Sequence, residues 1–286
     1  MTAMLNVSGL TKSYANKAVL ENVNLTLSAG QILGLVGPNG AGKTTCLQAI
    51  LGLTNFEGNI DVLGYNPRKQ REKMLRDVAY VTDVAVLPKW IKVSQALTYM
   101  QGVHPNFSRA KAEAFLAKTN IPTSAKVNTL SKGMVTQLHL ALILAIDAKI
   151  LVLDEPTLGL DILTRRQFYS HLLEDFYDED KCIIVTTHQI EEIENILTDV
   201  AFIRDGQIAL AENVDEIRRR FKLLAVDNEH LQQAKDLKPM SSHSMMGITS
   251  MLFDQADPAT LTTLGKVTTP TLADIFVGVM TQEANL

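Results

Sequence analysis

The sequence contains little cysteine, with only Cys46 and Cys182 among 286 residues. Two thiols are too few for a disulfide framework, and neither has a metal-ligand spacing, so we interpret both as core residues of a protein from a reducing compartment. The chain also lacks an excess of basic residues, because 27 Lys and Arg against 31 Asp and Glu give a net charge of −4. A broad basic surface that would attract nucleic acid is therefore excluded.

Long hydrophobic runs are missing as well. The longest apolar stretch covers residues 138–146 and is interrupted by His139, whereas a membrane-spanning helix needs about 20 apolar residues. Residues 1–6 lack the basic and apolar regions of a secretory signal. The sequence therefore predicts a cytoplasmic protein that reaches a membrane only through a partner.

What the chain does contain is an ordinary folded composition, with 46% apolar and 20% charged residues. Near its start, apolar residues alternate with polar ones at residues 4–7 and again at residues 19–27. A turn is expected at Ser8-Gly9 after the first of these patterns. Together the two patterns predict antiparallel strands, and hence an antiparallel β subdomain at the front of the chain.

Short, continuous apolar runs come next, and they are typical of buried strands. They lie at residues 32–36, 150–153, 182–186 and 200–203. Helical patterns separate these runs, which indicates an α/β architecture with a parallel sheet. The last run is followed by Asp205-Gly206 and then by residues 207–210, so we expect a hairpin there.

Two further regions complete the predicted organisation. Residues about 90–147 contain helical patterns but no convincing strand, and they predict a helical insert within a first domain of residues 1–221. Residues 222–286 have mixed patterns that end in a helix at 272–280, so a small C-terminal α+β appendage is expected. The fold class is then α/β, with an antiparallel β subdomain, a helical insert and the C-terminal appendage.

The clearest chemical motif follows the first buried strand directly. Its spacing is that of the phosphate-binding P-loop, in the order Gly37, Pro38, Asn39, Gly40, Ala41, Gly42, Lys43 and Thr44. Glycines let the backbone N–H groups turn toward phosphates at the positive end of the following helix. Lys43 is expected to reach the β- and γ-phosphates of ATP, and Thr44 to bind Mg²⁺, with Thr45 beside it among the nucleotide contacts. The motif therefore predicts that residues 1–221 form a nucleotide-binding domain with a P-loop NTPase core.

A second motif supplies carboxylates. The strand at residues 150–153 ends in Asp154 and Glu155. Asp154 is placed to hold Mg²⁺, directly or through water. Glu155 is placed to polarise a water molecule aimed at the γ-phosphate, so we expect it to be the catalytic base. Lys43 of the P-loop is expected to be a second catalytic residue, through its contact with the phosphates.

Three more segments give the sequence a family resemblance. Leu130-Ser131-Lys132-Gly133-Met134 precedes the Asp154 strand, Gly159-Leu160-Asp161 follows Glu155, and Thr186-Thr187-His188 ends the next strand. With the P-loop, this order resembles the ATP-binding cassette (ABC) ATPases over residues 1 to about 220. The Leu-Ser-Lys-Gly-Met form resembles a bacterial subgroup of exporter-type cassettes whose membrane subunits are separate chains.

The resemblance implies roles for several positions. Ser131 and Gly133 match the signature motif, which contacts the γ-phosphate of ATP held by the opposite subunit of a dimer. Tyr14 matches the aromatic residue that stacks on adenine, and Asp161 matches the loop that crosses the dimer interface. His188 matches the catalytic switch histidine near the γ-phosphate.

The sequence departs from the family pattern at Asp83. The family usually has glutamine at the position that aligns here, and the alignment can shift by a residue or two. A carboxylate adds negative charge beside the phosphates and cannot donate a hydrogen bond when ionised, but it can bind Mg²⁺. We therefore expect Asp83 to be a third metal ligand, beside Thr44 and Asp154. Within the signature, Lys132 stands where glycine is usual.

The predicted function is that of an ATP-hydrolysing transport subunit. Two copies, or one copy and a related ATPase, would enclose two ATP molecules and drive a separate integral membrane subunit, for export, at the inner face of the cell membrane. That partner is expected near residues 84–92, where Trp90 and Leu87 are either apolar anchors or core residues. The alternatives are a regulatory ABC ATPase without a transporter and a nucleotide switch with slow turnover.

Overall fold

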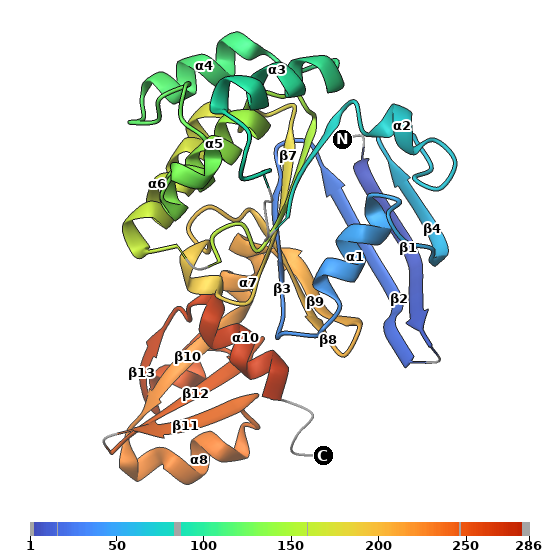
Figure 1. The fold of residues 1–286 in the computed structure, drawn as a ribbon. Helices are drawn as coiled ribbons and strands as arrows, with labels where there is room; N and C mark the ends of the chain where they lie inside the picture. Colours follow the sequence, from blue (N-terminus) through green and yellow to red (C-terminus); the bar gives the residue numbers. More distant parts are fainter. Residues whose placement is uncertain (1–2, 16, 83–86, 159, 246, 282–286) are drawn as a thin grey trace.

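The computed structural model describes residues 3–15, 17–82, 87–158, 160–245 and 247–281. Within these residues the strands form three sheets, which Figure 1 shows side by side along the molecule. The predicted nucleotide-binding domain contains a three-stranded sheet and a six-stranded core sheet, and a four-stranded sheet belongs to the C-terminal region. The fold is thus mixed α/β, as predicted.

The front of the chain forms an antiparallel sheet. Its strands are β1 (Ala3–Tyr14), β2 (Lys17–Ser28) and β4 (Glu57–Val62), in the order β2-β1-β4. The turn predicted at Ser8-Gly9 is wrong, because β1 continues through these residues and its pairing with β2 shifts register between Val7 and Leu10. Gly9 has φ +63°, a conformation that a β-bulge absorbs without ending the strand.

The core sheet has the strand order β5-β6-β7-β3-β8-β9. Its strands are β3 (Ile32–Val36), β5 (Val78–Val81), β6 (Ile150–Asp154), β7 (Cys182–Thr187), β8 (Asp199–Arg204) and β9 (Gln207–Asn213). β5, β6, β7, β3 and β8 pair in parallel with one another, and the edge strand β9 is antiparallel to β8. The parallel sheet and the hairpin at Asp205-Gly206 are therefore confirmed.

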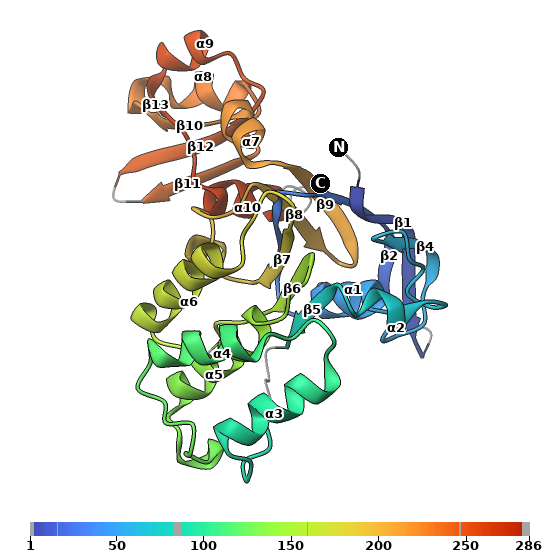
Figure 2. The same cartoon turned by 90° about the horizontal axis from the view of Figure 1, so that it is seen from above.

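Each buried strand serves two hydrophobic cores, because successive side chains point to opposite faces of a sheet. In β6, Ile150 and Val152 join a core that α1 (Lys43–Ile50) shares with the antiparallel sheet. Leu151 and Leu153 join a second core under α5 (Lys132–Leu144) and α6 (Ile162–Asp175). Figure 2 shows α1 between the core sheet and β2, with α5 and α6 on the opposite side.

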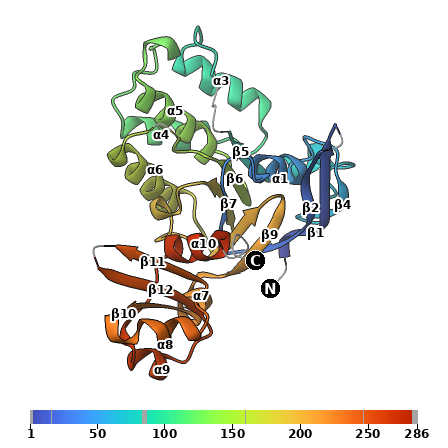
Figure 3. The ribbon, with the colours of Figure 1, turned by 90° about the horizontal axis from the view of Figure 1, so that it is seen from below.

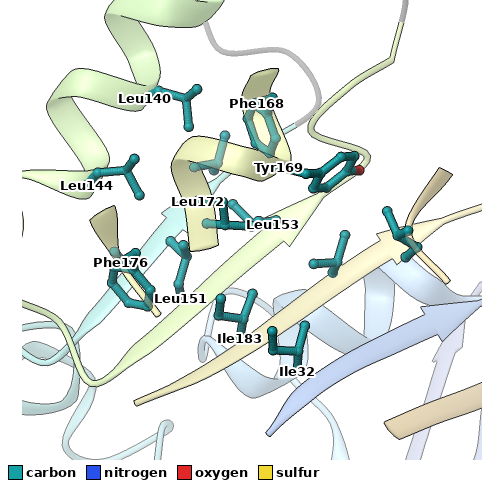
Figure 4. Close-up of a cluster of buried hydrophobic side chains, with 14 of the residues drawn as sticks. Ile32, Leu140, Leu144, Leu151, Leu153, Phe168, Tyr169, Leu172, Phe176 and Ile183 are labelled. Atoms are coloured by element: carbon teal, nitrogen blue, oxygen red, sulfur yellow. The ribbon is translucent and has the colours of Figure 1, made fainter. Parts of the chain in front are cut away.

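Figure 4 shows the second core, where Leu140 and Leu144 of α5 and Phe168 and Leu172 of α6 lie over the β6 strand that carries Leu151 and Leu153. The helical insert is confirmed and consists of α3 (Val93–Val103), α4 (Arg109–Ala117), the 3₁₀ turn η1 (Val127–Thr129) and α5. A short α2 (Arg71–Met74) lies between β4 and β5.

The C-terminal region begins after α7 (Val214–Arg220). Its elements are β10 (Phe221–Val226), η3 (Asn228–His230), α8 (Leu231–Asp236), β11 (Ser241–Met245), β12 (Ile248–Asp254), α9 (Pro258–Thr262) and β13 (Gly265–Thr268). The sheet order β11-β12-β10-β13, with all neighbours antiparallel, is that of a split βαβ fold. The predicted mixture of helices and strands is confirmed, but the sequence patterns missed β11 and β13, because both strands are polar and mostly exposed.

The last helix, α10 (Leu272–Thr281), joins the C-terminal sheet to the core. Figure 3 shows α10 between the β11–β12 hairpin and the core sheet. Leu272, Ile275 and Val279 are buried in the same core as Val36 of β3. Across the described ranges, no helix combines the length and the apolar character that crossing a membrane requires.

Replacement of Leu172 by alanine tests the core between α6 and the sheet. Leu172 is fully buried, so Leu172→Ala should lower the free energy of unfolding by about 2–5 kcal/mol, measured by urea denaturation. Gln167→Ala, at an exposed position of the same helix, should change it by less than about 0.5 kcal/mol. Equal effects of the two substitutions would contradict this view of the core.

Candidate functional site

The P-loop lies between β3 and α1, where two glycines bring its backbone close to neighbouring strands. A Cβ atom on Gly37 would lie 2.3 Å from the carbonyl oxygen of Ile203 in β8. Gly42 has φ +105°, and a Cβ atom there would lie 2.9 Å from the carbonyl oxygen of Val19. Only glycine fits at these two positions without moving backbone, so the loop takes its shape from contacts with β2 and β8.

Lys43 begins α1 and points back across the loop. Its Nζ donates to the carbonyl oxygens of Gly37 and Pro38 at 2.7 and 3.3 Å. It also forms an ion pair of 3.3 Å with Glu155 Oε1, and the residue is only 6% exposed. The ammonium group is thus oriented within the loop, and a phosphate oxygen that Lys43 bound would compete with the Glu155 carboxylate.

Asp154, the buried last residue of β6, accepts two hydroxyl hydrogen bonds at one oxygen. The hydroxyl of Thr186 in β7 donates to Asp154 Oδ1 at 2.6 Å, and that of Thr44 in α1 donates to it at 3.2 Å. Parallel pairing places Asp154 opposite Thr186, so the contact follows from the register of the sheet. The structure therefore brings Thr44 and Asp154 together, as the two motifs predicted.

Glu155 has an unusual backbone, with φ +47°. Non-glycine residues rarely adopt this conformation, and it persists where the surroundings hold it in place. Here the Glu155 N–H donates to the hydroxyl of Thr186 at 3.1 Å and to its carbonyl oxygen at 3.2 Å. The Glu155 side chain is then directed at two cationic or titratable groups, since Oε1 faces Lys43 and Oε2 lies 2.8 Å from His188 Nδ1. Because an ionised carboxylate can only accept hydrogen bonds, the Nδ1–H group of His188 is the donor of this one.

A cavity of about 450 Å³ opens over these groups. It is lined by Val19, Asn39, Gly40, Gly42, Lys43, Thr44, Thr45, Glu155, Leu158 and His188. The two motifs and the predicted switch histidine thus meet at one opening at the carboxyl ends of β3, β6 and β7. Val19 and Leu158 were not predicted, because their contacts with the cavity depend on how β2 and the loop after β6 pack.

Other predicted residues lie elsewhere. Tyr14 does not line this cavity; its hydroxyl lies 3.4 Å from the Thr54 hydroxyl, and Lys12 Nζ lies 4.5 Å from its ring centre. Tyr14 is 46% exposed. Its role toward adenine therefore remains a prediction. The predicted metal ligand Asp83 lies outside the described residues.

The remaining predicted residues are at the beginnings of helices. Ser131 is the N-cap of α5, where its hydroxyl accepts from the Met134 N–H at 3.3 Å, and Gly133 lies in the first turn. Asp161 caps α6 by accepting from the N–H groups of Leu163 and Thr164. The hydrogen bond from the Thr164 side chain, with those from the backbone, holds the pKa of the Asp161 carboxyl below its usual value. Neither Ser131 nor Asp161 lines the cavity of its own chain.

Arg165, which does not line the cavity, connects segments beside the site, and the sequence patterns missed it. It forms an ion pair with Glu192, its Nη1 donates to Gln189 Oε1 at 2.9 Å, and its Nε donates to the carbonyl oxygen of Leu160 at 2.8 Å. Arg165 therefore connects the loop before Asp161 to the segment that follows His188. Only tertiary structure reveals this, because Gln189 and Glu192 lie far along the chain from Arg165, with a separation of 24 residues for Gln189.

Comparison with known proteins places the whole arrangement in a family. A family model described as ABC transporter matches residues 20–158. The lantibiotic transport ATP-binding protein SrtF of Streptococcus pyogenes is 31% identical over 218 residues, which cover 74% of this chain and 92% of that protein. The Nod factor export ATP-binding protein I of Rhizobium meliloti strain 1021 is 33% identical over 217 residues, which cover 72% of this chain and 63% of that protein.

A solved structure agrees with these relatives. The ATP-binding subunit of an ABC transporter has a TM-score of 0.67 and 26% sequence identity, and the match covers 76% of this chain and 92% of that one. The region that the family model matches includes the P-loop and the strand that ends in Asp154, and the solved structure shares the fold. The chain belongs to the ABC transporter family, as an ATP-binding subunit that hydrolyses ATP.

Proposed function

We propose that two copies of this chain, or one copy and a related ATPase, enclose two ATP molecules. Each ATP would lie between the P-loop of one subunit and the Ser131 segment of the other. The observation that supports this arrangement is the position of Ser131 and Gly133, which begin a helix at the surface, away from the cavity of their own chain. A helix N-terminus attracts phosphate through its free N–H groups.

Glu155 is the proposed general base of the hydrolysis. Its carboxylate takes the proton from a water molecule that attacks the γ-phosphate, while Lys43 binds the phosphate and His188 orients the carboxylate. This assignment is supported by the 2.8 Å contact of His188 Nδ1 with Oε2 and the 3.3 Å contact of Lys43 with Oε1. When phosphate draws Lys43 away, the Oε1 atom becomes available to accept the proton.

Thr44 and Asp154 are the proposed ligands of Mg²⁺. Both present hard oxygen atoms, as Mg²⁺ prefers, and their side chains already lie within hydrogen-bond distance of each other at 3.2 Å. When bound, the ion neutralises charge on the phosphate oxygens. Thr186 would orient the metal-binding carboxylate, since its hydroxyl donates to Asp154 at 2.6 Å.

The work of the ATPase is proposed to be delivered to a separate integral membrane subunit, for export. Trp90, one of the two residues predicted as anchors, is 72% exposed, whereas Leu87 packs partly against the core. Trp90 is therefore the better candidate for contact with that subunit. Export as the direction is supported by the names of the relatives that act in Nod factor export and lantibiotic transport. The protein would then lie at the inner face of the cell membrane.

Glu155→Gln tests the proposed base. The amide keeps the shape of the side chain but cannot take a proton, so the turnover of ATP should fall by about 10²–10⁴-fold while ATP binding is retained. Steady-state phosphate release and size-exclusion chromatography with ATP would detect lost hydrolysis and an accumulated dimer. Glu179→Gln, which makes the same charge change at an exposed position, should behave as wild type. Hydrolysis by Glu155→Gln at the wild-type rate would refute the base assignment.

Ser131→Arg tests action across the dimer. The long cation should block the surface that meets the other subunit's ATP, and so abolish turnover without changing ATP affinity of the monomer. Because Ser131 is also a helix cap, the control is Ser108→Arg, which removes the equivalent cap of α4 with the same 3.3 Å geometry. Each substitution should cost about 1 kcal/mol of stability. The idea fails if monomer affinity falls, or if both variants lose turnover equally.

Asp83→Gln tests the departure from the family pattern. If Asp83 aligns with the usual glutamine, its charge opposes the phosphates by about 1–4 kcal/mol before metal neutralises it. The amide should then raise the ATPase rate or reduce its dependence on Mg²⁺, as measured by initial rates over a Mg²⁺ titration. Asp180→Asn, at an exposed position, controls for a general charge effect. Superimposable titration curves for wild type and Asp83→Gln would place Asp83 away from the metal.

A further inference from the structure

We propose that the C-terminal helix α10 positions the catalytic His188, so that the C-terminal region sets the rate of hydrolysis without contributing to ATP binding. This inference rests on the catalytic role proposed above for His188. The connection is the short segment from His188 to Glu194, which includes η2 (Ile190–Glu192) and which α10 contacts directly.

Complementary charges from the core hold both ends of α10. At its beginning, the Leu272 N–H donates to Glu194 Oε2 at 3.2 Å, which places a carboxylate at the positive end of the helix dipole. At its end, Arg204 Nη1 donates to the carbonyl oxygens of Val279 and Met280, each at 3.1 Å. A cation at the negative end is also favourable. The core therefore fixes the position of α10 along its axis as well as its depth.

Apolar contacts hold the same helix against the core. Leu272 and Ile275 are fully buried in one cluster with Ile190 and Ile193, the two isoleucines that flank Glu192. One turn further along α10, the ring of Phe276 meets that of Phe202 edge to face at 5.2 Å. The apolar cluster that holds α10 against the core thus also holds the segment after His188.

That segment is short and tied at several points, so a displacement at one end reaches the other. The Gln189 N–H donates to the Thr187 hydroxyl at 2.9 Å, and Arg165 binds both Gln189 and Glu192. His188 itself is joined to the site by the hydrogen bond from its Nδ1 to Glu155 Oε2. Loss of the contacts between α10 and the core should therefore make His188 more mobile, while the P-loop keeps its own contacts with β2 and β8.

The other side of α10 lies against the C-terminal sheet. A Cβ atom on Gly278 would lie 2.4 Å from Leu252 Cδ2 of β12, so the helix and the sheet approach closely at this point. Arg220 strengthens the connection by pairing with Glu212 of the core sheet and with Asp254 at the end of β12. A movement of the C-terminal sheet would consequently move α10, and with it the segment after His188.

The test compares two variants of the full-length protein with wild type. Glu194→Gln keeps the volume of the side chain but removes the charge at the start of α10, and Phe276→Ala removes the ring contact. Both should lower kcat by about three- to tenfold, a small displacement of a catalytic group, with an unchanged Kd for a fluorescent ATP analogue. Hydrogen exchange should become faster in the peptide 188–194 and stay unchanged in the P-loop peptide.

Val277→Ala is the matched control, since Val277 lies on α10 beside Phe276 but is 55% exposed; its kcat and exchange should equal those of wild type. The proposal is overturned if kcat of Glu194→Gln and Phe276→Ala is unchanged, if exchange in peptide 188–194 does not increase, or if ATP affinity falls together with kcat. A failure of the role proposed for His188 shows separately, because His188→Ala would then hydrolyse ATP like wild type.

Discussion

The hydrogen bond from Thr186 to Asp154 is the contact on which the geometry of the site depends. It joins Asp154, the last residue of β6, to Thr186 near the end of the neighbouring parallel strand β7, and it does so at 2.6 Å in a buried position. The same hydroxyl accepts from the Glu155 N–H and so holds that residue at φ +47°. Without this bond, Asp154 would lose a partner and Glu155 would relax toward ordinary backbone angles, away from Lys43 and His188. The proposed metal ligand and the proposed base therefore depend on the same hydroxyl group.

The site could be predicted from sequence where its residues are close together along the chain. The P-loop and the Asp154-Glu155 pair are local patterns, and the rule that parallel strands end at one edge of the sheet explains why they meet. Residues that act through packing could not be predicted in this way. Val19 and Arg165 have no local motif, and their contacts exist only once β2 and α6 are in place. The roles of Tyr14, Ser131 and Asp161 concern adenine or a second subunit, so they came from resemblance alone.

The helices and strands could likewise be predicted where the local sequence pattern is strong. Buried strands such as β6 and the helices of the insert have strong apolar patterns, which made them predictable. β11 was missed because it has the sequence Ser-Ser-His-Ser-Met and is stabilised by its pairing with β12 instead of by apolar burial. Ser8-Gly9 was expected to be a turn because those residue types favour turns. The surrounding sheet overrode that local preference by pairing β1 on both sides, with β2 and with β4.

The segment from His188 to Glu194 combines a proposed catalytic contact with a connection to α10. His188 faces Glu155, Glu192 is paired with Arg165, and Glu194 accepts from the first turn of α10. Ile190 and Ile193, which lie between these polar residues, are buried in the core. The polar side chains therefore cannot shift independently, since each is attached to the same pair of buried anchors. A change in the loop before Asp161 or in the C-terminal sheet would reach His188 through this segment, because Arg165 and α10 hold it from two different sides.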